Sequence, residues 1–206
     1  MKTILQTTFY ILLFLFINIC YGQKIYRFDK IVNNTFSTNL FPDQQRTNLF
    51  NSEDYSYHMT IYNRNDSLVS RICDTKENQI HYFNIDKSDS LKLYFIETKK
   101  MTKNVSDYKF EFSEIKEKKG IKKITFKILN NKDKKIAKYK FIIKETDKSY
   151  FSVFRLSTLE TQLYNKIKPH TNFIILKSKG TNISGRFVKY KLDSIEDIDL
   201  NITIPN

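Results

Sequence analysis

The chain has 206 residues, 40% of them hydrophobic, and it contains 17 Phe and 13 Tyr but only two Cys. This apolar content excludes a disordered chain, and the cysteine count excludes a disulfide scaffold. The formal charge of +13 comes mainly from lysine, in a chain rich in the residues that AT-rich codons favour. Because specific phosphate recognition favours the planar arginine side chain, this charge argues against a nucleic-acid partner.

Residues 1–22 have the three parts of a cleavable secretory signal peptide. Lys2 supplies a positive start, residues 9–17 form an apolar run, and small residues follow at Cys20 and Gly22. We expect cleavage after Gly22, which leaves Gln23 first; lipidation of Cys20 would instead place the cut before that cysteine. The run is shorter than the roughly 20 residues that cross a bilayer, so no transmembrane helix is expected after cleavage. Residues 23–206 are predicted to form a single β-rich domain.

Most of this domain alternates apolar and polar residues with a period of two, which predicts strands. Residues 24–32 open the pattern, and residues 33–53 interrupt it as an irregular segment. This segment either serves as a lid or a partner-docking loop or is pinned to the core. The alternation then recurs in residues 55–61, 67–73, 78–85, 91–95, 108–112, 124–128, 137–143, 149–155, 172–178, 185–192 and 198–204. Short polar links with Asn, Asp and Gly predict hairpins. The fold class expected is mainly β: an antiparallel meander of ten to twelve strands, arranged as a curved sheet, a half-barrel or a sandwich.

One short helix is expected near the C-terminal third of the chain. Residues 157–160 read Ser-Thr-Leu-Glu, the order of a capping box, in which the first serine caps a helix and the glutamate bonds back to it. Leu159, Leu163 and Ile167 then recur at helical spacing until Pro169. The pattern predicts a helix over residues 158–167.

Catalytic and metal-binding patterns are absent from the sequence. The three histidines stand on separate elements, and His58 and His81 fall on the polar side of strands, where solvated side chains are expected. No glycine frames a serine nucleophile or a phosphate loop. Cys73 is expected to be a buried small residue, and residues 197–201 an acidic C-terminal edge strand. The prediction is a protein that is not an enzyme and has no cofactor or metal.

The candidate ligand site is marked by more apolar side chains on the strand faces than one short helix could cover. Tyr108, Phe110 and Phe112 share one face of a predicted strand, and Tyr139 and Phe141 share one face of another. Aromatic side chains bury about 150–250 Å² each, so this face must be covered. Either the sheet fills its own core, or a cavity remains that an apolar or lipid-like ligand occupies with these five residues as its wall.

The residues around the predicted cleavage site, Cys20-Tyr21-Gly22-Gln23, resemble those of small exported proteins of AT-rich Gram-negative bacteria, as do residues 51–57 and 202–205. The meander with one helix is similar in outline to the periplasmic lipoprotein-carrier half-barrel. Such a resemblance implies a protein of the periplasm or cell surface that binds a lipid-like ligand or an envelope component. Two alternatives stay open: a structural or cell-surface interaction protein with no small ligand, and a small outer-membrane β-barrel.

Overall fold

The computed structural model describes residues 23–64, 67–86, 92–101, 107–158, 167 and 169–205. The predicted signal peptide, including Cys20 and Gly22, lies outside the described residues, and so does most of the helix predicted over residues 158–167. Within the described part, the elements in chain order are β1 (Lys24–Thr38), β2 (Gln44–Phe50), β3 (Tyr57–Arg64), β4 (Ser67–Asp74), β5 (Gln79–Asp86), β6 (Lys92–Lys100), β7 (Lys109–Phe112), β8 (Lys116–Lys118), β9 (Ile121–Leu129), β10 (Lys135–Glu145), α2 (Phe151–Thr158), β11 (Phe173–Thr181) and β12 (Phe187–Ile204).

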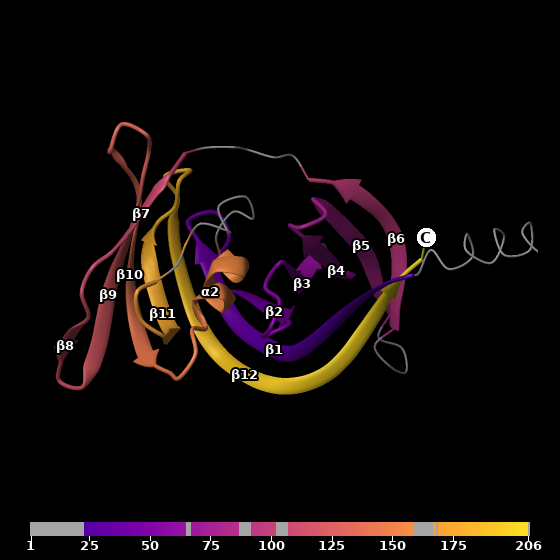
Figure 1. Ribbon diagram of the computed structural model, residues 1–206. Coiled ribbons are helices and arrows are strands. Elements are labelled where there is room, and N and C mark those ends of the chain that lie inside the picture. The colour runs from indigo at the N-terminus through magenta and orange to yellow at the C-terminus, as the bar shows by residue number, and fades with distance from the viewer. Residues whose placement is uncertain are drawn as a thin grey trace, which may run out of the picture. The chain divides into compact units, whose positions relative to one another are not determined.

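All the described strands belong to one antiparallel sheet, which confirms the predicted fold class (Figure 1). The strand order is β6-β5-β4-β3-β2-β1-β12-β11-β10-β9-β7, and β8 pairs with β9 beside β7. The sheet is open, with β6 at one edge and β7 at the other. Strands β1 to β6 form one meander, and β7 with β9 to β12 forms another. The two meanders meet where β1 lies next to β12 in the order.

Contacts divide the chain into two units. The smaller unit comprises the chain up to Arg27 together with residues 201–206, and the larger one runs from Phe28 to Leu200. In the described part of the smaller unit, Tyr26, Ile202 and Ile204 are buried, and the Lys24 ammonium lies 5.2 Å from the centroid of the Tyr26 ring. The features described below belong to the larger unit.

Two predicted segments differ from the structure. Residues 33–53 are mostly strand rather than irregular: β1 continues to Thr38, and β2 pairs with it from Gln44 to Phe50. Residues 149–155 are not a strand, because α2 begins at Phe151 and runs to Thr158. The backbone N–H of Phe151 is 3.4 Å from the Ser149 hydroxyl oxygen, which accepts it at the start of the helix.

The C-terminal strand also differs from expectation. Residues 185–192 and 198–204 were predicted as two strands with an edge at residues 197–201, whereas β12 is continuous from Phe187 to Ile204 and lies between β1 and β11 in the order. Its bonds to β1 explain this position: Asn33 donates to the Ser194 hydroxyl over 3.0 Å, and Thr35 to the Asp193 carboxylate over 2.8 Å.

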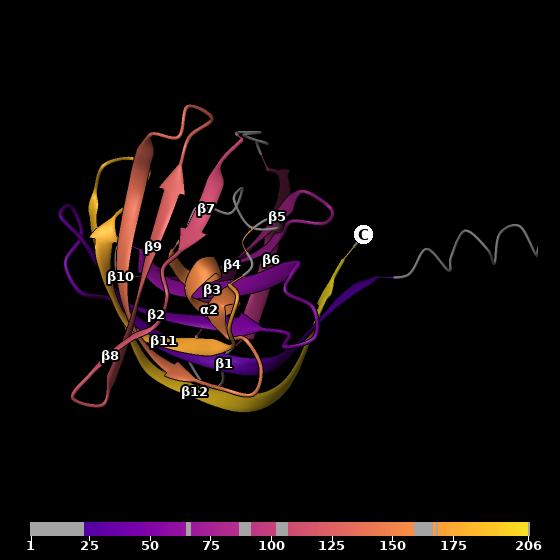
Figure 2. The same cartoon turned by 60° about the vertical axis from the view of Figure 1, so that its left-hand side comes forward.

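Figure 2 shows α2 against one face of the sheet. The main core lies between the helix and this face. It joins aromatic side chains of β9 and β10 to Phe151 and Phe154 of the helix. Cys73 is buried, as predicted. Among the described residues, no helix is both long enough and apolar enough to cross a membrane.

Candidate functional site

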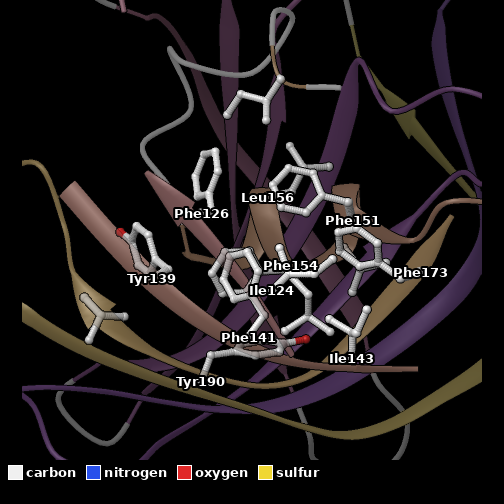
Figure 3. Close-up of a cluster of buried hydrophobic side chains, with 14 of the residues drawn as sticks. Ile124, Phe126, Tyr139, Phe141, Ile143, Phe151, Phe154, Leu156, Phe173 and Tyr190 are labelled. Atoms are coloured by element: carbon white, nitrogen blue, oxygen red, sulfur yellow. The ribbon is translucent and has the colours of Figure 1, made fainter. Parts of the chain in front are cut away.

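The five predicted ligand residues lie on one side of the sheet, as Figure 3 shows for Tyr139 and Phe141. Tyr139 and Phe141 are almost fully buried, whereas Tyr108, Phe110 and Phe112 are partly buried against the same core. The Phe154 ring of α2 lies 4.9 Å from that of Phe141 and 5.9 Å from that of Tyr139, measured between centroids. The helix therefore occupies the space over Tyr139 and Phe141, and a ligand site formed by the five residues stays a prediction.

A pocket of about 320 Å³ opens elsewhere, where β11 and β12 diverge. The paired register of these strands runs from Thr181↔Phe187 to Lys177↔Lys191. Beyond that pair, four apolar side chains from the two strands line the pocket: Ile174, Leu176, Leu192 and Ile195. The β10–β11 register shifts between Ile142 and Ile143, which leaves Leu176 as the extra residue of a bulge. The bulge and the end of the β11–β12 ladder together explain an opening at this point of the sheet.

The remaining lining of this pocket is polar: Lys30, Lys144, Thr146, Tyr150, Glu196 and Asp197. Lys30 of β1 forms an ion pair with Asp197, whose side chain is 84% exposed. An exposed pair of this kind adds little stability, about 0–1 kcal/mol. The lining thus combines apolar side chains with charges of both signs and a phenol, a composition suited to an amphiphilic small molecule.

A second polar feature crosses β1, β2 and β3 on the face that α2 contacts. The Thr60 hydroxyl donates to the Asn48 side-chain oxygen over 2.9 Å, and the Asn48 amide donates to the Asn34 side-chain oxygen over 2.7 Å. Both asparagines are completely buried. Buried amides are costly unless hydrogen-bonded, so this chain of bonds compensates in part for placing polar groups in the interior, while the Asn34 side-chain nitrogen has no acceptor.

Arginines adjoin this chain of bonds. Arg46 of β2 lies 4.0 Å from the centroid of the Phe36 ring and donates to the carbonyl oxygen of Ser157 in α2 over 3.3 Å. Arg71 of β4 stands directly opposite Thr60. Burial lowers the pKa of Arg46 to about 10, and the positive charge of Arg71 adds to that effect. Arg155 of α2 is buried as well.

His58 and His81 are buried, at 2% exposure each, so the prediction of solvated histidines is wrong. Both faces of β3–β5 contain buried residues, and a polar position in the alternation is therefore not an exposed one. The His81 ring contacts the Thr98 hydroxyl at 2.8 Å. His58 stacks on Phe50 with ring centroids 6.2 Å apart. Within the described part of the chain, no three His, Cys, Asp or Glu side chains gather to hold a metal ion.

His58 should make the protein less stable at acidic pH. Burial, followed by the charges of Arg71 and Arg155, lowers the pKa of His58 to about 3, against about 6.5 in an unfolded chain. The unfolded state therefore binds the proton first, and stability present above pH 6.5 is lost as the pH falls toward 3. Urea unfolding at pH 7.5 and 4.5 should show a smaller loss in His58→Gln than in the unaltered protein. Equal losses in the two proteins would contradict this assignment.

Comparisons with known proteins give weak likenesses. No family model and no curated protein matches the chain. A solved LolA-superfamily protein from Nitrosomonas europaea is 6% identical, with a TM-score of 0.30, over 87% of this chain and 89% of that one. A DUF1329-family protein from Desulfovibrio piger is 6% identical, with a TM-score of 0.26, over 89% of each chain. Likeness below a TM-score of 0.5 defines neither a family nor a ligand for this chain.

Proposed function

We propose that this chain is an exported, non-enzymatic binding protein that holds an apolar or lipid-like ligand in the pocket between β11 and β12. The observation that carries the proposal is the pocket itself, about 320 Å³ with an apolar wall formed by Ile174, Leu176, Leu192 and Ile195. Its volume falls at the lower end of the range of about 300–1,000 Å³ for small-molecule sites. The ligand is accordingly one short chain or ring system rather than a large lipid.

The polar side chains that line the pocket would orient a bound ligand. Lys144 of β10 is paired in register with Ile174 of β11, so a charged and an apolar side chain stand next to each other at the pocket. Tyr150 contributes an aromatic ring with a hydroxyl group. An amphiphile would place its apolar part against the isoleucine and leucine side chains and its polar end beside these groups.

The pocket should bind 1-aminoanthracene, an uncharged apolar fluorophore. Leu176→Phe places a larger side chain in the pocket, so we expect the Kd for this probe to rise about tenfold or more, measured by fluorescence titration. Ile121→Phe, at a 44% exposed position on β9, is the matched control and should leave the Kd unchanged. If the unaltered protein binds no probe, or if both variants lose binding equally, the pocket is not a ligand site and an interaction protein without a small ligand becomes the better description.

Export has its own test. We expect the protein isolated from the envelope of its native host to begin at Gln23, because the residues before it have the order of a cleavable signal. Intact-mass measurement decides this. A mass that retains residues 1–22, or one that carries acyl chains on Cys20, would show that the leader is used differently.

A further inference from the structure

We propose that the face of β2, β3 and β4 beside α2 holds a binding site for one oxyanion, a carboxylate or a phosphate group, between the guanidinium groups of Arg46 and Arg71. This site is distinct from the pocket between β11 and β12 and does not depend on a ligand there.

Strand register brings the two arginines to one face. Thr60 of β3 stands opposite both Asn48 of β2 and Arg71 of β4, so these side chains share a face. Arg46 is two residues from Asn48 along β2 and therefore points the same way. Tyr62 lies two residues beyond Thr60 on β3, and its ring centroid is 5.9 Å from the Arg71 guanidinium carbon. The β2–β3 register pairs Thr47 with Ile61, so the next position along the strands places Tyr62 opposite Arg46.

The two guanidinium groups place positive charge on the same face of the sheet. Among the described residues, no carboxylate forms an ion pair with Arg46 or Arg71. The contacts of Arg46 are neutral, namely the Ser157 carbonyl, the Gln44 side-chain oxygen at 2.9 Å and the Phe36 ring. Burying like charges together without an anion is costly, and a bound oxyanion would remove that cost.

Unsatisfied polar atoms lie on the same face. The Nε atom of Arg71 and the side-chain nitrogen of Asn34 are buried hydrogen-bond donors with no acceptor, and Nδ1 of the buried His58 has no partner. His58 stands opposite Cys73, two residues from Arg71 on the same face. Donors left without acceptors around two guanidinium groups indicate a ligand that supplies oxygen acceptors. The planar guanidinium group can donate two parallel bonds to a carboxylate or phosphate.

The test uses the mature chain, sodium phosphate and sodium octanoate as anions, and octan-1-ol as the neutral control. Binding is followed by calorimetry and by the NMR signal of the Arg71 Nε–H group. We expect saturable binding of at least one anion, a shift of this signal, and no effect of octanol on it. Arg71→Gln should raise the Kd for the anion about tenfold or more. Arg186→Gln, at an exposed position between β11 and β12, is the matched control and should leave the Kd unchanged.

The outcomes separate the possible sources of the anion. Octanoate binding much tighter than phosphate binding identifies the carboxylate of an amphiphile, and the reverse identifies a phosphate group. Leu176→Phe should leave the anion-induced shift of the Arg71 Nε–H signal intact, even if it weakens octanoate binding in the pocket, so failure of the pocket and failure of this site are distinguishable. Lack of saturable binding in the unaltered protein would overturn the proposal, as would equal weakening by Arg71→Gln and Arg186→Gln, which indicates diffuse attraction to surface charge.

Discussion

Replacing Phe141 by alanine should lower the free energy of unfolding by about 3–5 kcal/mol, as for other buried phenylalanines. Phe141 is 1% exposed. Its ring centroid lies 6.0 Å from that of Phe126, 6.3 Å from that of Phe151 and 4.9 Å from that of Phe154, so its loss leaves a space between the sheet and α2. Chemical denaturation followed by circular dichroism measures the change.

Phe110→Ala is the matched control for this variant. Phe110 is only partly buried, on the edge strand β7, and its ring contacts that of Phe126 at 6.3 Å. We expect Phe110→Ala to lower the free energy of unfolding clearly less than Phe141→Ala does. Small and similar losses for both variants would mean that the space over Phe141 is not filled, and would favour the aromatic face as the wall of a ligand cavity.

Gly180→Ala should destabilise the protein by about 1–3 kcal/mol, the usual cost of inserting a group into packed structure. Gly180 of β11 pairs with Tyr139 of β10. A Cβ atom at this position would overlap the carbonyl oxygen of Lys138 and lie 2.7 Å from the Cα atom of Tyr139. Because both obstacles are backbone atoms, the β10–β11 ladder must shift to admit the methyl group. Thermal unfolding of the variant should show a lower midpoint.

Gly185→Ala tests whether this cost comes from crowding. Gly185 has a φ of +74° and no atom within 4 Å of an added Cβ, so the variant incurs only the left-handed backbone cost of about 1–2 kcal/mol. We expect Gly180→Ala to be at least as harmful, with weakened hydrogen-exchange protection along β10 and β11. Unchanged protection in these strands would argue against a backbone clash.

The strands that the sequence predicted well are those with one apolar and one polar face. Residues 124–128 and 137–143 alternate because β9 and β10 bury one face and expose lysines on the other. The helix α2 was not predicted because six of its eight residues are buried, which leaves no polar face to produce a helical period. Residues 33–53 looked irregular for a related reason: the inward positions of β1 and β2 include Asn34 and Asn48, which are polar and buried.

The two candidate sites could not be predicted from local patterns. The pocket joins Lys30 of β1 to residues of β10, β11 and β12 that are more than 100 positions away along the chain. The pocket depends on the end of the β11–β12 ladder and on the bulge at Leu176, and neither feature leaves a signal in the sequence. Arg46 and Arg71 come together through the registers of β2, β3 and β4. The inward direction of Arg71 could have been inferred from the alternation, since it stands between Val69 and Cys73, whereas Arg46 lies in a segment without an apolar alternation.

The lysines on the edge strands of the sheet also bear on aggregation. A free edge strand presents unpaired backbone groups on which another chain can add a strand, and lysine is a common protection against such aggregation. At one edge β6 has exposed Lys92, Lys99 and Lys100, and at the other β7 has exposed Lys109, next to β8 with Lys116 and Lys118. Two copies meeting edge to edge would bring ammonium groups together. We therefore expect the same charge that suggests anionic partners to oppose edge-to-edge association, and added salt to weaken this protection by screening it.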